Sequence, residues 1–408
     1  MGEWSFLLPL FDIEVSVMLK VLYLSPWYPH RYDAMLGLFV RKHAEAVSRY
    51  CNVCVLYLFA DEKVENYEVV DQVTNGVREL YVYYPFSKFP VLRQLTKAFG
   101  FFRAFIKGYA LVEERFGRPD VTQANVLTRC GVLSYLLQKR WNIPYVVVEH
   151  WSRYLPSKNE YKGFVRKRVS ELVVRNASCM LPVTEHLADA MRRHGLRNDR
   201  YRVVHNVVDD FFFTAEKHPL ARGDRFRFLH VSCFSEPDKN VCGILRAVKR
   251  LSEKRTDFSM TMVGVGPDYE MVRNYAKELC LSDEIVSFLG ELSPTEVCRR
   301  FAESDAFVLF SNTENAPVVI SEALATGTPV ISTNVGGIPE MVDDESGCLI
   351  NPGDEGALCD KMDWMIDHYD SFNVSYIREK ASCYGYDAVG SFLVSLYEGL
   401  VLPREKRL

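Results

Sequence analysis

Residues 306–332 read AFVLFSNTENAPVVISEALATGTPVIS, and this stretch decides the fold class. The apolar runs at its two ends, 306–310 and 329–332, predict β-strands. The segment between them predicts a helix, because Pro317 suits a first helical turn and Gly327 suits the position past a helix end. A strand, a helix and a second strand in this order are typical of parallel sheets. The stretch therefore predicts an α/β fold.

The same alternation of strand-like and helical segments runs outward in both directions. Further strand-like runs lie at 20–24, 53–58, 121–125, 145–149, 179–183, 226–231, 259–264, 285–289 and 348–350. One helix is predicted at 38–49, and another at 387–400 from apolar residues at helical spacing. The chain is therefore predicted to contain two doubly wound, Rossmann-like parallel sheets.

The length of 408 residues exceeds what one hydrophobic core usually organises, so two domains are expected. A break in composition at 207–224, rich in turn formers, predicts the linker between them. The first domain is then 1–206 and the second is 207–386. Residues 387–408 are expected to pack back onto the first domain.

The composition is that of an ordinary globular protein, with 48% hydrophobic and 25% charged residues. Residues 1–208 carry 29 Lys and Arg against 20 Asp and Glu, a net charge of +9. The rest of the chain carries 20 Lys and Arg against 33 Asp and Glu, a net charge of −13.

The 11 cysteines are scattered along the chain. The C-x-x-C pair Cys51 and Cys54 lies in a strand-like run, which indicates core thiols in a reducing cytoplasm. No stretch has 18 uninterrupted apolar residues, so no membrane span is predicted. Residues 1–17 are interpreted as a non-native leader before a start at Met18.

Two glutamates accompany the predicted helix of the opening stretch. Glu314 follows the first strand and Glu322 lies within the helix. Ligands of open parallel sheets bind at the carboxyl ends of the strands, and the free N–H groups of a helix N-terminus favour a diphosphate. Glu322 can offer a carboxylate to ribose hydroxyls, while Glu314 can hydrogen-bond a sugar. A pair of solvated helix glutamates is the alternative interpretation.

The Glu-x7-Glu spacing, together with its flanks at 304–311 and 329–340, resembles glycosyltransferase family 4, a retaining group with the GT-B fold. The resemblance covers residues 20 to about 400. It implies two Rossmann-like domains facing a cleft, with a nucleoside-diphosphate sugar bound by the second domain. It also places Glu314 on the transferred sugar and Glu322 on the nucleotide ribose.

The loop after the first glutamate departs from the family pattern. Where the family often has Gly-Phe-Gly, this chain has Asn315, Ala316 and Pro317. Proline has no N–H, so the amides of Val318 and Val319 must carry more of the phosphate contact. Asn315, Val318 and Val319 are therefore assigned to the donor.

A second departure concerns positive charge. Lys239 matches the lysine that the family uses to neutralise the donor diphosphate, whereas Cys233 stands where the family usually has an arginine. Stabilisation of the leaving group must then rest on Lys239, on helix dipoles or on a basic residue supplied elsewhere. An ordinary surface lysine is the alternative for Lys239.

Three other strand ends carry site candidates by resemblance. His150 occupies the position of the family's cleft histidine and is assigned to the donor sugar, with a structural histidine as the alternative. Gly37 follows the first strand, where a glycine lets the backbone approach the donor phosphate, with a turn glycine as the alternative. Gly264, Gly266 and Leu289 lie in loops that flank the nucleotide base in the family.

The resemblance implies transfer of a hexosyl group from a nucleotide sugar to a glycan or lipid-linked acceptor, with retention, as in bacterial cell-surface polysaccharide or lipopolysaccharide synthesis. The predicted catalytic residues are His150, Glu314 and Lys239. No cofactor and no nucleic-acid partner are expected. No metal is expected either, because the Asp-x-Asp motif of the other large glycosyltransferase fold is missing.

Other functions stay open at this point. Cys233 makes a non-catalytic sugar-nucleotide or glycan-binding homologue conceivable, and a GT-B-like sugar-nucleotide epimerase is a further alternative. A phosphorylase would need a lysine-bound pyridoxal phosphate, for which the sequence carries no specific signature. A nicotinamide-dependent enzyme is disfavoured because the glycine fingerprint of dinucleotide-binding domains is absent.

A basic, aromatic-rich segment lies in the first half of the chain. Residues 86–112 contain no acidic residue, and 162–175 form a second basic run. The basic side chains of the first segment alternate with apolar ones and are Lys88, Arg93, Lys97, Arg103 and Lys107. This pattern is typical of an amphipathic helix on an anionic membrane. It predicts peripheral attachment to the inner face of the cytoplasmic membrane, with a core-packed helix as the alternative.

Overall fold

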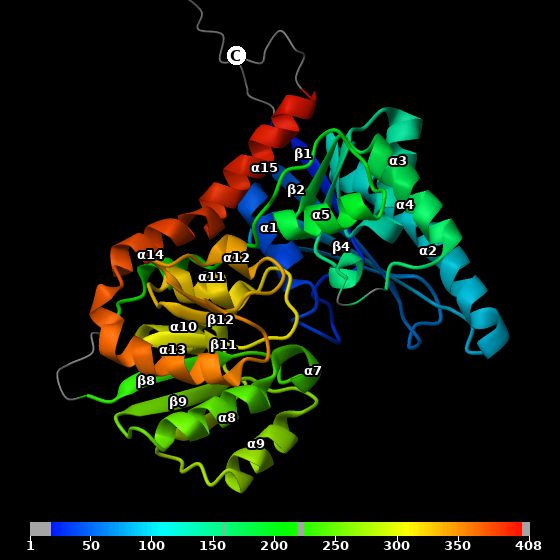
Figure 1. The fold of residues 1–408 in the computed structure, drawn as a ribbon. Helices are drawn as coiled ribbons and strands as arrows, with labels where there is room; N and C mark the ends of the chain where they lie inside the picture. The colour runs from blue at the N-terminus through cyan, green and yellow to red at the C-terminus, as the bar shows by residue number, and fades with distance from the viewer. Residues whose placement is uncertain (1–17, 157, 159, 219–223, 402–408) are drawn as a thin grey trace, which may run out of the picture.

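The computed structural model shows two α/β domains, each built around one sheet (Figure 1). It describes residues 18–156, 158, 160–218 and 224–401. The predicted leader, 1–17, lies outside the described residues. Within the described ranges, no helix is both long enough and apolar enough to cross a membrane.

The first sheet has seven strands among the described residues, in the order β3-β4-β2-β1-β5-β6-β7. Neighbouring strands are parallel except β3 and β4, which are antiparallel. The strands are β1 (Lys20–Ser25), β2 (Asn52–Ala60), β3 (Glu68–Thr74), β4 (Val77–Tyr84), β5 (Val121–Asn125), β6 (Tyr145–Glu149) and β7 (Cys179–Pro182). The strand order reverses between β1 and β5, and ligands of such sheets bind beside that point.

The hairpin of β3 and β4 differs from the sequence prediction, which has no strand between 58 and 121. All residues of β3 are exposed or half-buried, so its apolar signal is weak. Asn75 and Gly76 join the two strands with φ values of 49° and 81°. Both positive φ values belong to the Asn-Gly turn that favours two-residue hairpins. This dipeptide is the signal that could have revealed the hairpin.

Helices cover both faces of the first sheet. They are α1 (Leu38–Ser48), α2 (Pro90–Arg115), α3 (Leu127–Trp141), the 3-10 helix η1 (Ser152–Tyr154), α4 (Phe164–Asn176), α5 (Glu185–Arg193) and, returning from the second domain, α15 (Tyr386–Val401). Side chains alternate between faces along a strand. Leu22 and Leu24 of β1 therefore pack with α2, α3 and α4, whereas Val21 and Tyr23 pack with α1 and α15.

The second sheet is parallel throughout, in the order β10-β9-β8-β11-β12-β13. Its strands are β8 (Phe226–Val231), β9 (Phe258–Val263), β10 (Val286–Gly290), β11 (Ala306–Leu309), β12 (Val330–Thr333) and β13 (Gly347–Ile350). The order reverses between β8 and β11. The strands predicted from the sequence coincide with those of the structure to within a residue or two at each end.

Helices also flank the second sheet, with a core of Phe228, Met260 and Val308 on one face and Leu229, Phe307 and Ile320 on the other. They are α6 (Asp210–Thr214), α7 (Glu236–Lys239), α8 (Val241–Ser252), α9 (Tyr269–Glu278), α10 (Pro294–Glu303), α11 (Val318–Ala325), α12 (Ile338–Met341), α13 (Glu355–His368) and α14 (Val374–Ala381), with the 3-10 helices η2 (Tyr369–Ser371) and η3 (Ser382–Tyr384).

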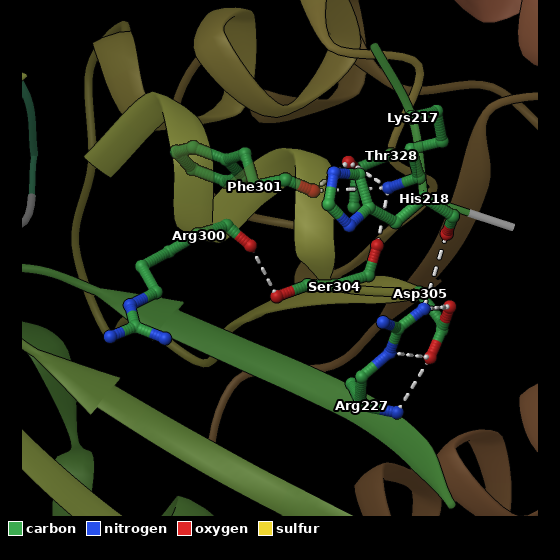
Figure 2. A network of polar contacts seen from close by, with 8 residues as sticks. All are labelled: Lys217, His218, Arg227, Arg300, Phe301, Ser304, Asp305 and Thr328. Carbon is green, nitrogen blue, oxygen red and sulfur yellow. Dashed lines mark hydrogen bonds and ion pairs between the residues drawn. The ribbon is translucent and has the colours of Figure 1, made fainter. Parts of the chain in front are cut away.

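The predicted linker is partly helical, because α6 lies within it and buries Phe212 in the second domain. Lys217 anchors the residues that follow. Its Nζ donates to the carbonyl oxygens of Phe301 at 3.1 Å and of Ser304, and to the Thr328 hydroxyl at 2.6 Å (Figure 2). Burial lowers the pKa of Lys217 to about 7. The connection is therefore fixed to the end of α10 before β8 begins.

Helix α15 carries the chain back from the second domain onto the first. Leu393 and Tyr397 are buried against the first sheet, and the Tyr397 hydroxyl donates to Gln123. A Cβ on Gly390 would lie 2.4 Å from the carbonyl oxygen of Ala46 in α1. The absence of a side chain at Gly390 therefore allows the two helices to pack closely.

Candidate active site between the two domains

A cavity of about 340 Å³ lies between the domains, at the carboxyl ends of β6 and β11. Its volume falls in the range of small-molecule sites. Residues of both domains line it. Five of them are site residues that the sequence predicts. These five are His150, Lys239, Glu314, Asn315 and Val318.

Glu314 and Lys239 form an ion pair at the wall of the second domain. Glu314 follows β11, and its side chain is 9% exposed. Its Oε1 accepts hydrogen bonds from Lys239 Nζ at 2.5 Å and from the Ser311 hydroxyl at 2.8 Å. An ammonium group has three N–H donors, so Lys239 can bind an anion while it stays paired with Glu314.

The N-terminus of α11 reaches the same cavity. Pro317 stands at the N-cap, one position before the helical turn in which the sequence predicts it, and α11 begins at Val318. The first N–H groups of a helix have no partner within it, and with the helix dipole they favour an anion. Val318 lines the cavity, so this end of α11 can face a phosphate group.

His150 faces the cavity from the first domain, directly after β6. The buried Glu149 carboxylate holds the loop by accepting the backbone N–H groups of His150 at 3.1 Å and Trp151 at 2.9 Å. Burial, followed by the nearby His43, holds the pKa of His150 well below its usual value. The imidazole is therefore neutral at pH 7. Its Nε2 is buried without a hydrogen-bond partner among the described residues, which leaves it for a ligand.

Asn315 joins the two domains. Its Nδ2 donates to the carbonyl oxygen of His150 at 2.9 Å, and its Oδ1 accepts from the Thr184 hydroxyl at 3.1 Å. Both ends of the amide are thus engaged with the first domain. The predicted contact between Asn315 and the donor stays a prediction, and the side chain also links the two domains.

Asn206 also lines the cavity, although the sequence predicts no role for it. It is 8% exposed and its Nδ2 donates to the carbonyl oxygen of Ala316 across the cleft at 3.2 Å. This bond fixes the amide so that Oδ1, which has no partner among the described residues, remains available as an acceptor. A polar residue directly before the predicted linker is the signal that could have found it.

The remaining predicted donor-binding residues do not line this cavity. They are Gly37, Val319, Glu322, Gly264, Gly266 and Leu289. Gly37 and Gly264 have φ values of 67° and 123°, and added Cβ atoms would lie 2.4 Å from Trp27 backbone atoms and 1.9 Å from the Ser232 carbonyl oxygen. Tight turns therefore require both glycines. Their contact with a donor stays a prediction.

Glu322 lies one turn into α11 and is half-buried. Burial raises the pKa of its carboxyl group to about 7, and nearby Lys42 partly offsets this effect. Lys42 in α1 is itself paired with Asp209 at 2.9 Å. Glu322 is therefore poised between its charged and neutral forms near pH 7, and its predicted bond to ribose stays a prediction.

Two protein families match successive parts of the chain. "Glycosyl transferase 4-like domain" matches residues 40–207 and "Glycosyl transferases group 1" matches 213–381. Together they cover most of the chain, and they coincide with its two domains. The protein belongs to the GT-B glycosyltransferases of the family 4 type.

Similar proteins agree with this assignment. The chain is 26% identical to D-inositol 3-phosphate glycosyltransferase of Corynebacterium efficiens, over 58% of this chain and 61% of that protein. It is 29% identical to a putative colanic acid biosynthesis glycosyltransferase of Escherichia coli, over 46% of this chain and 47% of that one. These matches thus span about half to three fifths of the relatives' lengths.

A solved structure shows the same fold. The Anabaena protein HepE, solved in complex with UDP, has a TM-score of 0.70 and 20% identity with this chain. The likeness covers 93% of this chain and 100% of that one. The two Rossmann-like domains described above are therefore those of the GT-B fold.

Proposed function

We propose that the protein transfers a sugar from a nucleoside-diphosphate sugar to a hydroxyl acceptor, with retention of the anomeric configuration. One observation carries the proposal. Glu314, Lys239 and the N-terminus of α11 meet His150 in a single cavity between the domains. Carboxylate and imidazole groups can bind sugar hydroxyls, while the lysine and the helix N-terminus can bind a diphosphate.

The cavity residues would act by orientation and by electrostatics. Glu314 and the neutral His150 hydrogen-bond the transferred sugar, and Asn206 Oδ1 can accept a further hydroxyl. Lys239 and the amides at the start of α11 stabilise the negative charge that grows on the departing diphosphate. Holding donor and acceptor in register lowers the entropic part of the barrier.

The proposed reaction is a direct exchange at the anomeric carbon. The bond from this carbon to the diphosphate oxygen breaks, and the acceptor oxygen bonds to it on the same face. The acceptor proton passes to the departing diphosphate. Because Lys239 and α11 supply positive charge, we propose that the reaction needs no metal ion.

The nucleotide is best identified by binding. The HepE structure contains UDP, which makes UDP and its sugars the first probes, with GDP and its sugars in parallel. A ligand that binds only the folded state raises the melting temperature, so a thermal-shift screen should show stabilisation by one of the two series. No stabilisation by either series at high concentration would argue against the proposed donor.

We further propose a glycan or lipid-linked acceptor used in the synthesis of a cell-surface polysaccharide or lipopolysaccharide. The match to a protein named for colanic acid biosynthesis supports this setting. An acceptor of that kind would be met at a membrane surface.

Exposed apolar side chains on α2 support contact with such a surface. Val91 of α2 is 86% exposed, and Phe89, at the N-cap of this helix, is 74% exposed. Five further large apolar side chains of α2 are exposed, namely Leu92, Leu95, Phe99, Phe102 and Ile106. Large apolar patches of this kind mark interaction sites. The helix extends away from the first domain (Figure 1).

Helix α4 adds a second set of exposed groups. Phe164 and Val165 are exposed beside Arg166 and Lys167, and both α2 and α4 pack on the same face of the first sheet. Basic side chains interleaved with apolar ones favour an anionic lipid surface. We therefore propose that 86–112 and 162–175 attach the first domain to anionic membranes.

A further inference from the structure

Two lysines line the cavity, one from each domain. Lys239 belongs to α7 of the second domain, and Lys158 follows η1 in the first. His150 is the other basic side chain among the described residues that line the cavity, and it is neutral at pH 7. The positive charge that the lining side chains present to a ligand therefore comes from the two lysines.

Asp238 fixes Lys158 in place across the cleft. Lys158 Nζ lies 2.5 Å from Asp238 Oδ1, which also accepts from the Thr313 hydroxyl at 2.8 Å. Asp238 immediately precedes Lys239, so the two ammonium groups are held by neighbouring positions of α7. Lys158 and Asp238 are about one-third exposed, at 32% and 37%, and an ion pair of this exposure adds little net stability. The main effect of this ion pair is to fix the position of the Lys158 ammonium group at the cavity wall.

Each lysine retains donors for a ligand. An ammonium has three N–H groups, and Asp238 engages one of those on Lys158 in the same way that Glu314 engages one on Lys239. Up to four N–H donors thus remain on two cations that face one cavity. A pair of linked phosphate groups matches that arrangement, because each phosphate carries negative oxygens.

We propose that Lys158 binds the diphosphate of the donor together with Lys239, so that the nucleoside diphosphate is held by both domains at once. This inference rests on the proposed function. It gives the diphosphate one ammonium group from each domain, each held in place by a carboxylate of the second domain. It also means that the full diphosphate site exists only when the domains are together.

The test is a calorimetric titration with UDP and with GDP of the parent, Lys158→Gln, Lys158→Arg and a matched control, Lys162→Gln. Lys162 is an exposed lysine of the same segment that does not line the cavity. Loss of a charged hydrogen bond should weaken binding of the preferred nucleotide about tenfold in Lys158→Gln. Lys158→Arg keeps the charge and should stay close to the parent, as should the control.

The nucleoside without phosphates, uridine or guanosine, separates charge from shape. Its affinity should be the same for the parent and Lys158→Gln. An equal loss for nucleoside and diphosphate would overturn the inference, because it would show that Lys158 acts through the shape of the cleft. So would a Lys158→Gln variant that binds the diphosphate within twofold of the parent. If the parent itself binds neither UDP nor GDP, that result contradicts the proposed function, on which this inference rests.

Discussion

Cys233 is exposed in the loop after β8, so this position has room for a larger side chain. The family resemblance places an arginine here, directed at the donor diphosphate. We expect Cys233→Arg to fold normally and to keep or strengthen nucleoside-diphosphate binding, because it adds a cation. Thermal unfolding and a UDP or GDP titration check both parts. A variant that unfolds, or that folds but loses affinity, would mean that the position does not face the diphosphate.

Glu322 should make stability depend on pH. Its carboxyl pKa is raised from 4.5 to about 7 in the folded protein, so the folded state holds a proton that the unfolded state has lost. The contribution of Glu322 to stability therefore falls as pH rises from about 4.5 to 7 and then levels off. Glu322→Gln should remove this fall and be about 1–3 kcal/mol more stable than the parent above pH 7. Urea unfolding across this range is the measurement, and equal pH dependence in both proteins would contradict the assignment.

Among the structural elements, the connection into the second domain depends on one buried amine. Lys217→Met keeps the apolar stem but removes the donor to the carbonyl oxygens of Phe301 and Ser304. The carbonyl oxygen of Phe301 keeps hydrogen bonds from the Ser304 N–H and the Thr328 hydroxyl, so the loss falls on the carbonyl oxygen of Ser304. A buried acceptor without a partner costs about 1–3 kcal/mol, so the free energy of unfolding should drop by this amount. Lys254→Met is the control, since Lys254 is exposed and weakly paired. A loss no greater than that of the control would show that the Lys217 hydrogen bonds in Figure 2 are not stabilising.

Helix α2 is the element that the membrane proposal depends on. Changing Arg93, Lys97, Arg103 and Lys107 to Gln should abolish salt-sensitive pelleting with anionic vesicles, because each surface cation contributes about 1 kcal/mol near anionic lipid. Neutral vesicles should not bind the parent strongly. A second variant with Lys249, Lys254, Arg273 and Arg299 changed to Gln removes the same charge from the second domain and should pellet like the parent. Equal, negligible pelleting of all three proteins would leave an acceptor that is met in solution.

Local sequence signals explain which elements were predictable. Strands such as β11 and helix α11 follow from an apolar run, a proline and a glycine that act within a few residues. Strand β3 of the hairpin with β4 is exposed or half-buried along its length, so its apolar pattern is weak. The bond between Thr184 and Asn315 joins residues 131 apart in the chain, and no local periodicity predicts it. For the same reason, Lys158 and Asn206 emerge as cavity residues only once the domains are placed together.

For the molecule as a whole, several contacts hold the domains face to face. Glu340 of the second domain accepts the backbone N–H groups of Glu185 at 2.8 Å and His186 at 2.7 Å, at the start of α5. A carboxylate is stabilised there by the helix dipole. Asn315 adds its two bonds to the first domain on the cavity side. We expect a nucleotide sugar to enter and leave when these contacts open, as in other enzymes with closing domains.

The protein is proposed to transfer a sugar from a nucleotide sugar with retention, in the cavity between its two domains. The direct measurement is proton NMR of the product formed from the sugar nucleotide selected by thermal shift, with a panel of glycan and lipid-linked acceptors. We expect a new glycoside whose anomeric configuration matches that of the donor, and at least tenfold slower turnover in Glu314→Gln, where a charged hydrogen-bond acceptor to the sugar is lost. Glu303→Gln, a change on α10 outside the cavity, should turn over like the parent. A product of inverted configuration, or turnover that Glu314→Gln leaves unchanged, would contradict the account.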